Sequence, residues 1–124
     1  MNYKNYQDFK IFQITFGSHT ITFEDKFGEI FIKFSLIENN QLCFLPSQSN
    51  SFRLISTSEK PEYFTLNRIG SDRNLHEKLN KLAFFINDIE VIIEMELNSI
   101  LITSQSDKLS IFPNSGNSFY INIS

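Results

Sequence analysis

Apolar and polar residues alternate along most of the chain, with the period of two that is typical of a β-strand. One such run places Phe12, Ile14 and Phe16 on the same face, and Gly17-Ser18-His19 follows it as a turn. No internal repeat of roughly 20 to 50 residues is apparent among these runs. Strands are expected within 9–24, 29–37, 42–45, 52–57, 63–66, 89–97, 100–102, 109–111 and 119–123.

One segment departs from this alternation and predicts a helix. Asn74-Leu75-His76-Glu77 has the form of a capping box, with Asn74 as the N-cap residue. Apolar residues then recur at 3.6-residue spacing, and Asn87 suits the end of a helix because Asn tolerates the left-handed conformation. We expect one main helix at about residues 74–86, with an apolar stripe of Leu75, Leu79, Leu82, Ala83 and Ile86.

Strands followed by one helix and further strands indicate an α+β fold. The predicted turns are short, which favours antiparallel pairing over crossover connections. The sequence therefore predicts a mostly antiparallel β-sheet, in the form of a curved sheet or partial barrel, packed against the main helix. A chain of 124 residues corresponds to one domain, so we expect a single domain over residues 1–124.

Composition predicts the cellular compartment of the protein and disfavours one class of partner. Cys43 is the only cysteine, which excludes a disulfide within the chain, and no secretory signal or apolar run of roughly 18 to 20 residues is apparent. We therefore expect a cytoplasmic protein without membrane association. The chain has 11 basic and 14 acidic side chains, a net charge of -3, so binding to nucleic acid through a basic field is disfavoured.

Acidic residues are concentrated on one predicted strand. Alternate residues of a strand share a face and lie about 7 Å apart, which would align four carboxylates with an isoleucine among them. One interpretation is an ordinary solvated face, neutralised by cations on neighbouring strands. The other is a docking strip for a basic partner protein. The candidate partner-binding residues are Asp88, Glu90, Ile92, Glu94 and Glu96.

Patterns for metal, cofactor or catalytic chemistry are weak. A straight strand does not converge its carboxylates on one ion, so we expect no metal and no cofactor. His19 in a turn and His76 in the first helical turn are both expected to be exposed, and Cys43 is expected to be a buried, inert thiol. No Gly-rich phosphate loop is present. We therefore name no catalytic residue and do not expect an enzyme.

These observations favour a small protein-binding protein that acts by occlusion. Its most concrete form is an immunity or inhibitor protein whose acidic surface neutralises a cognate toxin, such as a nuclease. One alternative is a small-ligand or lipid-binding α+β cup with a Phe-lined cavity, because the chain has 14 Phe. Another is an enzyme that uses a His/carboxylate pair. The sequence leaves open the identity of the partner, the strand order and pairing into a homo-oligomer.

Overall fold

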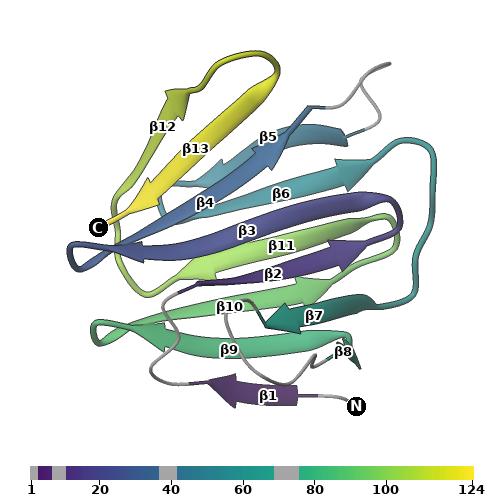
Figure 1. Ribbon diagram of the computed structural model, residues 1–124, viewed down its shortest axis with the longest axis horizontal. Helices are drawn as coiled ribbons and strands as arrows, with labels where there is room; N and C mark the ends of the chain where they lie inside the picture. Colours follow the sequence, from purple (N-terminus) through teal and green to yellow (C-terminus); the bar gives the residue numbers. More distant parts are fainter. Residues whose placement is uncertain (1–2, 7–10, 37–41, 69–75) are drawn as a thin grey trace.

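The computed structural model describes residues 3–6, 11–36, 42–68 and 76–124, which form two β-sheets stacked face to face (Figure 1). Sheet A has the strand order β1-β9-β10-β11-β6-β5, and sheet B has the order β12-β13-β4-β3-β2-β7-β8. All neighbouring strands pair antiparallel except β1 and β9, which are parallel. The strands are β1 (Tyr3–Tyr6), β2 (Ile11–Phe16), β3 (His19–Lys26), β4 (Glu29–Ser35), β5 (Leu42–Gln48), β6 (Ser51–Ser56), β7 (Phe64–Arg68), β8 (His76–Leu79), β9 (Lys81–Ile86), β10 (Ile89–Met95), β11 (Ser99–Ser104), β12 (Leu109–Pro113) and β13 (Ser118–Ile123).

The hydrophobic core lies between the two sheets and is built from the alternating positions that the sequence predicts. Within it, the Phe84 ring from sheet A meets the edges of two stacked rings from sheet B, with centroid distances of 4.7 Å to Phe12 and 5.5 Å to Phe23. Such edge-to-face and stacked pairs add about 0.5–1.5 kcal/mol each beyond the area that they bury. These rings fill this part of the interior by contacting one another.

Two tight turns have two consecutive residues in the left-handed backbone conformation. Phe27 and Gly28 join β3 to β4, and Asn87 and Asp88 join β9 to β10, all with positive φ. Two consecutive residues with positive φ define a type I′ turn, whose twist matches that of the flanking strands. A Cβ atom at Gly28 would lie 3.0 Å from Asn87 Nδ2, so the turns of the two sheets approach each other closely.

The predicted helix at 74–86 is wrong, and with it the α+β class, because the described part of the chain is all-β. Residues 74 and 75 lie outside the described residues, and the remainder forms β8 in sheet B and β9 in sheet A. Leu79 enters the core from sheet B and Leu82 enters it from sheet A. Because the chain passes from sheet B to sheet A at Asn80, the core residues Leu79 and Leu82 are three positions apart. The same spacing is expected for one turn of an amphipathic helix.

The predicted strands and the antiparallel pairing are confirmed, with one change at Pro46. The strand expected over 42–45 was to end before this proline, but β5 continues through it to Gln48, with an irregularity in the pairing between Pro46 and Gln48. Strand β5 is the edge of sheet A, where the missing N–H of proline is tolerated. No helix in the described residues is long and apolar enough to cross a membrane.

The two halves of the chain repeat one arrangement of strands. In each half a meander lies in one sheet (β2-β3-β4 or β9-β10-β11), and a hairpin follows in the other sheet (β5-β6 or β12-β13). The hairpin of each half pairs with the meander of the other half, because β6 lies beside β11 and β13 lies beside β4. The registers of these two pairings differ by a shift along the strands. The carbonyl of Asn50 accepts from the Ser104 amide, and the carbonyl of Asn117 accepts from the Leu36 amide.

The sequence follows the same correspondence once the strands are aligned. Core residues Ile21, Phe23, Ile30 and Ile32 correspond to Val91, Ile93, Ile100 and Ile102 at a constant offset. Pro46, Asn50, Ser51 and Phe52 recur in the same order as Pro113, Asn117, Ser118 and Phe119. Sequence inspection missed this repeat because apolar residues replace one another in the core and few residues are identical.

Candidate functional site

The predicted acidic strip is divided between a strand face and the two turns that flank it. Glu90, Ile92 and Glu94 lie at alternate positions of β10 and point away from the core, because the residues between them are buried. Asp88 lies in the preceding turn at a φ of 66°, and Glu96 follows the last residue of β10. The structure therefore brings three of the five predicted residues together on the outer face of sheet A.

Cations from neighbouring strands stand beside these carboxylates. Lys81 of β9 is directly opposite Glu94, and Arg53 of β6 donates from Nε to Glu96 Oε1 at 2.7 Å. This hydrogen bond raises the pKa of Arg53. Both side chains of the pair are about one-third or more exposed, so its contribution to stability is small. The acidic strip is thus partly neutralised at its Glu94 and Glu96 end.

Apolar side chains cross the same face, and sequence analysis did not group them because they come from different strands. Ile92 lies between Ala83 of β9 and Thr103 of β11 in the pairing register. Leu101, Ile55 and Leu45 continue the apolar surface toward the β5 edge, where Leu45 is 49% exposed. We call this surface the sheet A face; it consists of Leu45, Arg53, Ile55, Lys81, Glu90, Ile92, Glu94 and Leu101, whereas Ala83 beside it is buried.

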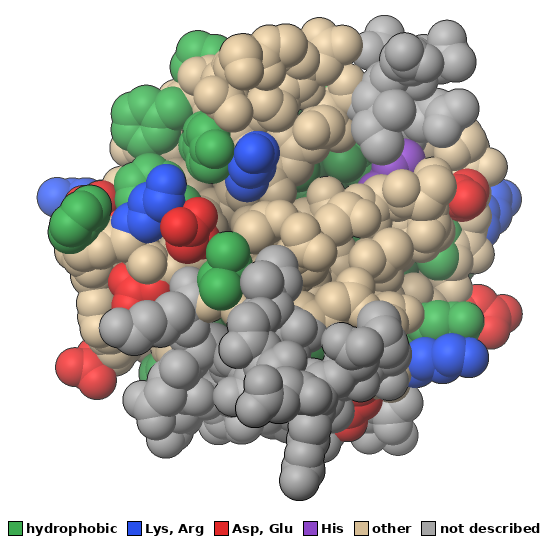
Figure 2. All heavy atoms as spheres, viewed as in Figure 1, with side chains coloured by type: hydrophobic (Ala, Val, Ile, Leu, Met, Phe, Trp, Pro, Cys, Tyr) green, Lys and Arg blue, Asp and Glu red, His purple; other side chains and the backbone are tan. Residues whose placement is uncertain are grey.

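The outer face of sheet B has the opposite character. Its central strands present amides and hydroxyls, and these bind one another: Gln13 Nε2 donates to Thr22 Oγ1, and Asn67 Nδ2 donates to Thr15 Oγ1, both at 3.0 Å. Figure 2 shows this face, with tan backbone and uncharged polar side chains over much of its middle and charged and hydrophobic side chains toward its left and right edges. On β3 and β4, the Lys26 and Lys33 ammonium groups lie 5.7 and 5.6 Å from the centroid of the Tyr120 ring.

His19 is fully buried, which contradicts its predicted exposure. Its Nε2 lies 3.0 Å from Ser56 Oγ and 3.9 Å from Glu59 Oε2, and its Nδ1 has no partner within the described part of the chain. Burial lowers the pKa of His19, and the nearby Glu59 opposes that shift. The ring is therefore neutral at pH 7, and its Nε2 shares a hydrogen bond with the Ser56 hydroxyl.

This cluster does not have the geometry of a catalytic triad. In a Ser-His-acid site the acid binds the ring nitrogen opposite the one that faces the serine, whereas Ser56 and Glu59 share Nε2 here. Ser56 is only 1% exposed, so its hydroxyl has little access to a substrate. Glu59 instead accepts hydrogen bonds from the amide and hydroxyl of Ser18 and holds the β2–β3 turn.

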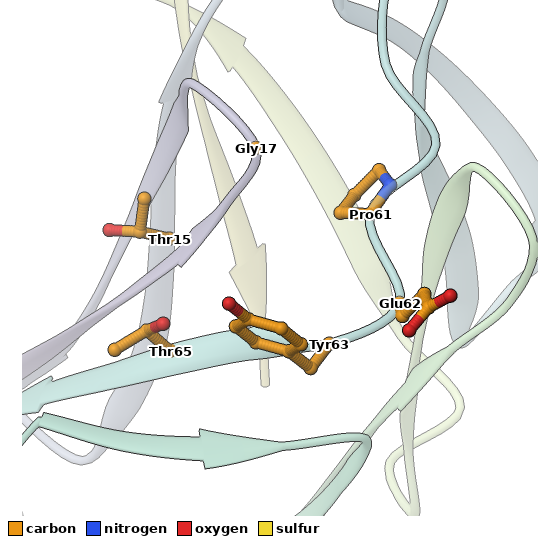
Figure 3. Close-up of a pocket in the computed structure, with 6 residues that line it drawn as sticks. All are labelled: Thr15, Gly17, Pro61, Glu62, Tyr63 and Thr65. Carbon is orange, nitrogen blue, oxygen red and sulfur yellow. The ribbon is translucent and has the colours of Figure 1, made fainter.

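A shallow depression lies next to this cluster, on the sheet B side (Figure 3). Gly17 of the β2–β3 turn and Thr15 of β2 form one wall, while the connection between β6 and β7 forms the other. Figure 3 shows the Tyr63 side chain pointing from this connection toward Thr15 and Thr65, with Pro61 on its other side. Sequence analysis missed the depression because it brings together residues far apart along the chain.

The other predictions for reactive groups have mixed outcomes. Cys43 is exposed on edge strand β5, so the prediction of a buried thiol is wrong. His76 begins β8 and not a helix. Among the described residues, no three His, Cys, Asp or Glu side chains are grouped to hold a metal ion.

Comparison with known proteins adds no assignment. No protein-family model, no curated protein and no solved structure matches the chain.

Proposed function

We propose that the chain is a protein-binding protein that acts by occlusion, and that its sheet A face contacts a partner with a basic surface. The observation that carries this proposal is the arrangement of that face, where partly exposed apolar residues of neighbouring strands lie beside the row of carboxylates on β10. Ile92, Leu101 and Ile55 are partly exposed, and Glu90 and Glu94 flank Ile92 along β10. Protein interfaces likewise combine an apolar centre with polar and charged residues beside it.

The internal repeat supports the same assignment. Ile92 and Glu90 of β10 correspond to Thr22 and Thr20 of β3, so the two halves keep apolar residues inside the sandwich but differ on its outer faces. Because both halves fold into the same strands, the fold itself does not require an isoleucine at position 92. A contact with another molecule gives the apolar and acidic residues of this face a physical role.

In its most concrete form, this protein is an immunity or inhibitor protein that covers the basic active-site surface of a toxin, such as a nuclease. Carboxylates at the rim would accelerate the encounter with such a surface, and apolar contacts at the centre would slow dissociation. The Glu90 and Asp88 end of the strip, which lies away from Arg53 and Lys81, would carry most of the attraction.

Comparison of two variants tests the proposal. The immobilised chain captures proteins from an extract of the organism that encodes it, in parallel with Ile92→Asp and with Thr22→Asp, its counterpart on sheet B. We expect the wild type and Thr22→Asp to retain one identified protein with a basic surface, and Ile92→Asp to lose it.

Purified partner then gives the dissociation constant for each form of the chain. We expect Ile92→Asp to weaken binding at least about 30-fold, equivalent to about 2 kcal/mol, and Thr22→Asp to change it less than about threefold. Equal affinities for the two variants, or an affinity for the wild type that does not fall with added salt, would contradict the proposal.

A further inference from the structure

We infer that the depression in Figure 3 binds one ring of a sugar. It lies on the sheet B side, whereas the proposed protein contact lies on the sheet A face, so the two inferences are independent. Its volume is about 260 Å³, slightly less than the ~300–1,000 Å³ of sites for drug-sized ligands. A space of this size suits a single small ring.

The lining combines an aromatic surface with hydroxyl and carboxylate groups. Tyr63 is 43% exposed, and the negative face of its ring attracts the weakly positive C–H groups on one side of a sugar ring. Thr15, Thr65 and Glu62 also line the depression. Threonine hydroxyls donate and accept hydrogen bonds, so Thr15 and Thr65 complement the hydroxyls of a sugar, while Figure 3 shows the Glu62 side chain at the rim, pointing away from the Tyr63 ring.

Neighbouring contacts hold these groups in place before a ligand arrives. The Lys78 ammonium lies 4.9 Å from the Tyr63 ring centroid, and Asn67 donates to Thr15 Oγ1, which leaves the Thr15 proton available for a ligand. Gly17 forms its part of the wall with backbone alone, because a Cβ atom there would lie 2.0 Å from Glu59 Oε2. Preorganisation of this kind reduces the entropic cost of binding.

The surroundings favour a neutral ligand that is rich in hydroxyls. Glu62 at the rim repels phosphates and carboxylates, and the amides and hydroxyls of Gln13 and Thr22 continue the polar surface across sheet B. In the second half of the chain, Phe85 and Asn87 occupy the positions that correspond to Thr15 and Gly17. The depression therefore belongs to one half and is not a requirement of the repeated fold.

Ligand-observed saturation-transfer NMR tests this inference on the full chain. The probes are the methyl glycosides of glucose, galactose, mannose and N-acetylglucosamine, at concentrations up to about 10 mM, within the range of weak binding. We expect at least one glycoside to receive saturation and to shift the backbone amides of Gly17, Tyr63 and Thr65 in the spectrum of the labelled chain. No saturation from any of the four would overturn the inference.

Two variants of Tyr63 and a matched control locate the site. Tyr63→Ala should weaken binding at least about tenfold, whereas Tyr63→Phe keeps the ring and should weaken it only a few-fold. Tyr120→Ala removes a tyrosine from the same face outside the depression and should leave the affinity unchanged. The inference fails if Tyr63→Ala binds like the wild type, or if Tyr120→Ala causes the larger loss.

Discussion

At the scale of single residues, the repeated fold does not require the buried polar pair of His19 and Ser56. The corresponding positions in the second half are Ile89 and Ile123, so an apolar pair serves the same place in the sandwich. Ser56→Ala should lower the free energy of unfolding by about 1–3 kcal/mol, because the buried His19 Nε2 then lacks its hydrogen-bonding partner. Adding His19→Ile should recover part of this loss, since both polar partners are then gone. Urea denaturation of the two variants measures the difference, and a double variant that is less stable than Ser56→Ala would contradict the pairing.

The same histidine gives stability a defined pH dependence. Burial lowers the pKa of His19 in the folded chain below its ordinary value of 6.5, so the unfolded chain binds the proton more readily. The contribution of neutral His19 is present above pH 6.5 and is lost as the pH falls toward the folded pKa, at up to about 1.4 kcal/mol per pH unit. Denaturation between pH 8 and pH 5 should show a steeper loss for the wild type than for the His19→Ile, Ser56→Ala variant. If the unfolding free energies of the two proteins fall in parallel over this pH range, His19 is excluded as the cause of the pH dependence.

At the scale of elements, the backbone conformation of the connection between β9 and β10 is that of a hairpin turn and not that of a helix end. Asp88 has a φ of 66°, at the second position of a type I′ turn, where glycine is preferred. Asp88→Gly should therefore raise the free energy of unfolding by up to about 1 kcal/mol, because it removes the strain of a Cβ atom in this conformation. Asp88→Ala is the matched control: it removes the same charge but keeps the Cβ atom, and it should not be stabilising. If Asp88→Gly lowers the free energy of unfolding, the type I′ conformation of this turn is contradicted.

The sequence was sufficient to predict the strands but not to predict how they assemble into two sheets. Period-two runs predicted β2, β3 and β10, because each strand has one buried face and adjacent residues point in opposite directions. The segment 76–86 failed because the chain changes sheets at Asn80, and local spacing cannot distinguish this change from a helical turn. The left-handed tendency of Asn87 was correctly recognised, but it serves a hairpin and not a helix.

At the scale of the whole molecule, the sandwich gives the protein two outer faces of different chemistry. The acidic strip was visible in the sequence because its residues are close together along the chain. The apolar residues beside it on β6 and β11 could not be recognised as one surface from the sequence. The depression around Tyr63 could not be recognised either, since both features depend on which strands are neighbours. Surfaces assembled across strands require the strand order, which the sequence did not predict.

The most direct test of the proposed contact measures which face of the sandwich touches the partner protein. In a cross-saturation NMR experiment, the chain carries labelled isoleucine methyl groups, and only the unlabelled partner obtained by capture is irradiated. Ile92 and Ile55 report on the sheet A face, and Ile11 of β2, opposite Glu24, reports on the outer face of sheet B. We expect the signals of Ile92 and Ile55 to lose intensity while that of Ile11 is unchanged. Loss at Ile11 with unchanged Ile92 and Ile55 would contradict a partner contact on the sheet A face.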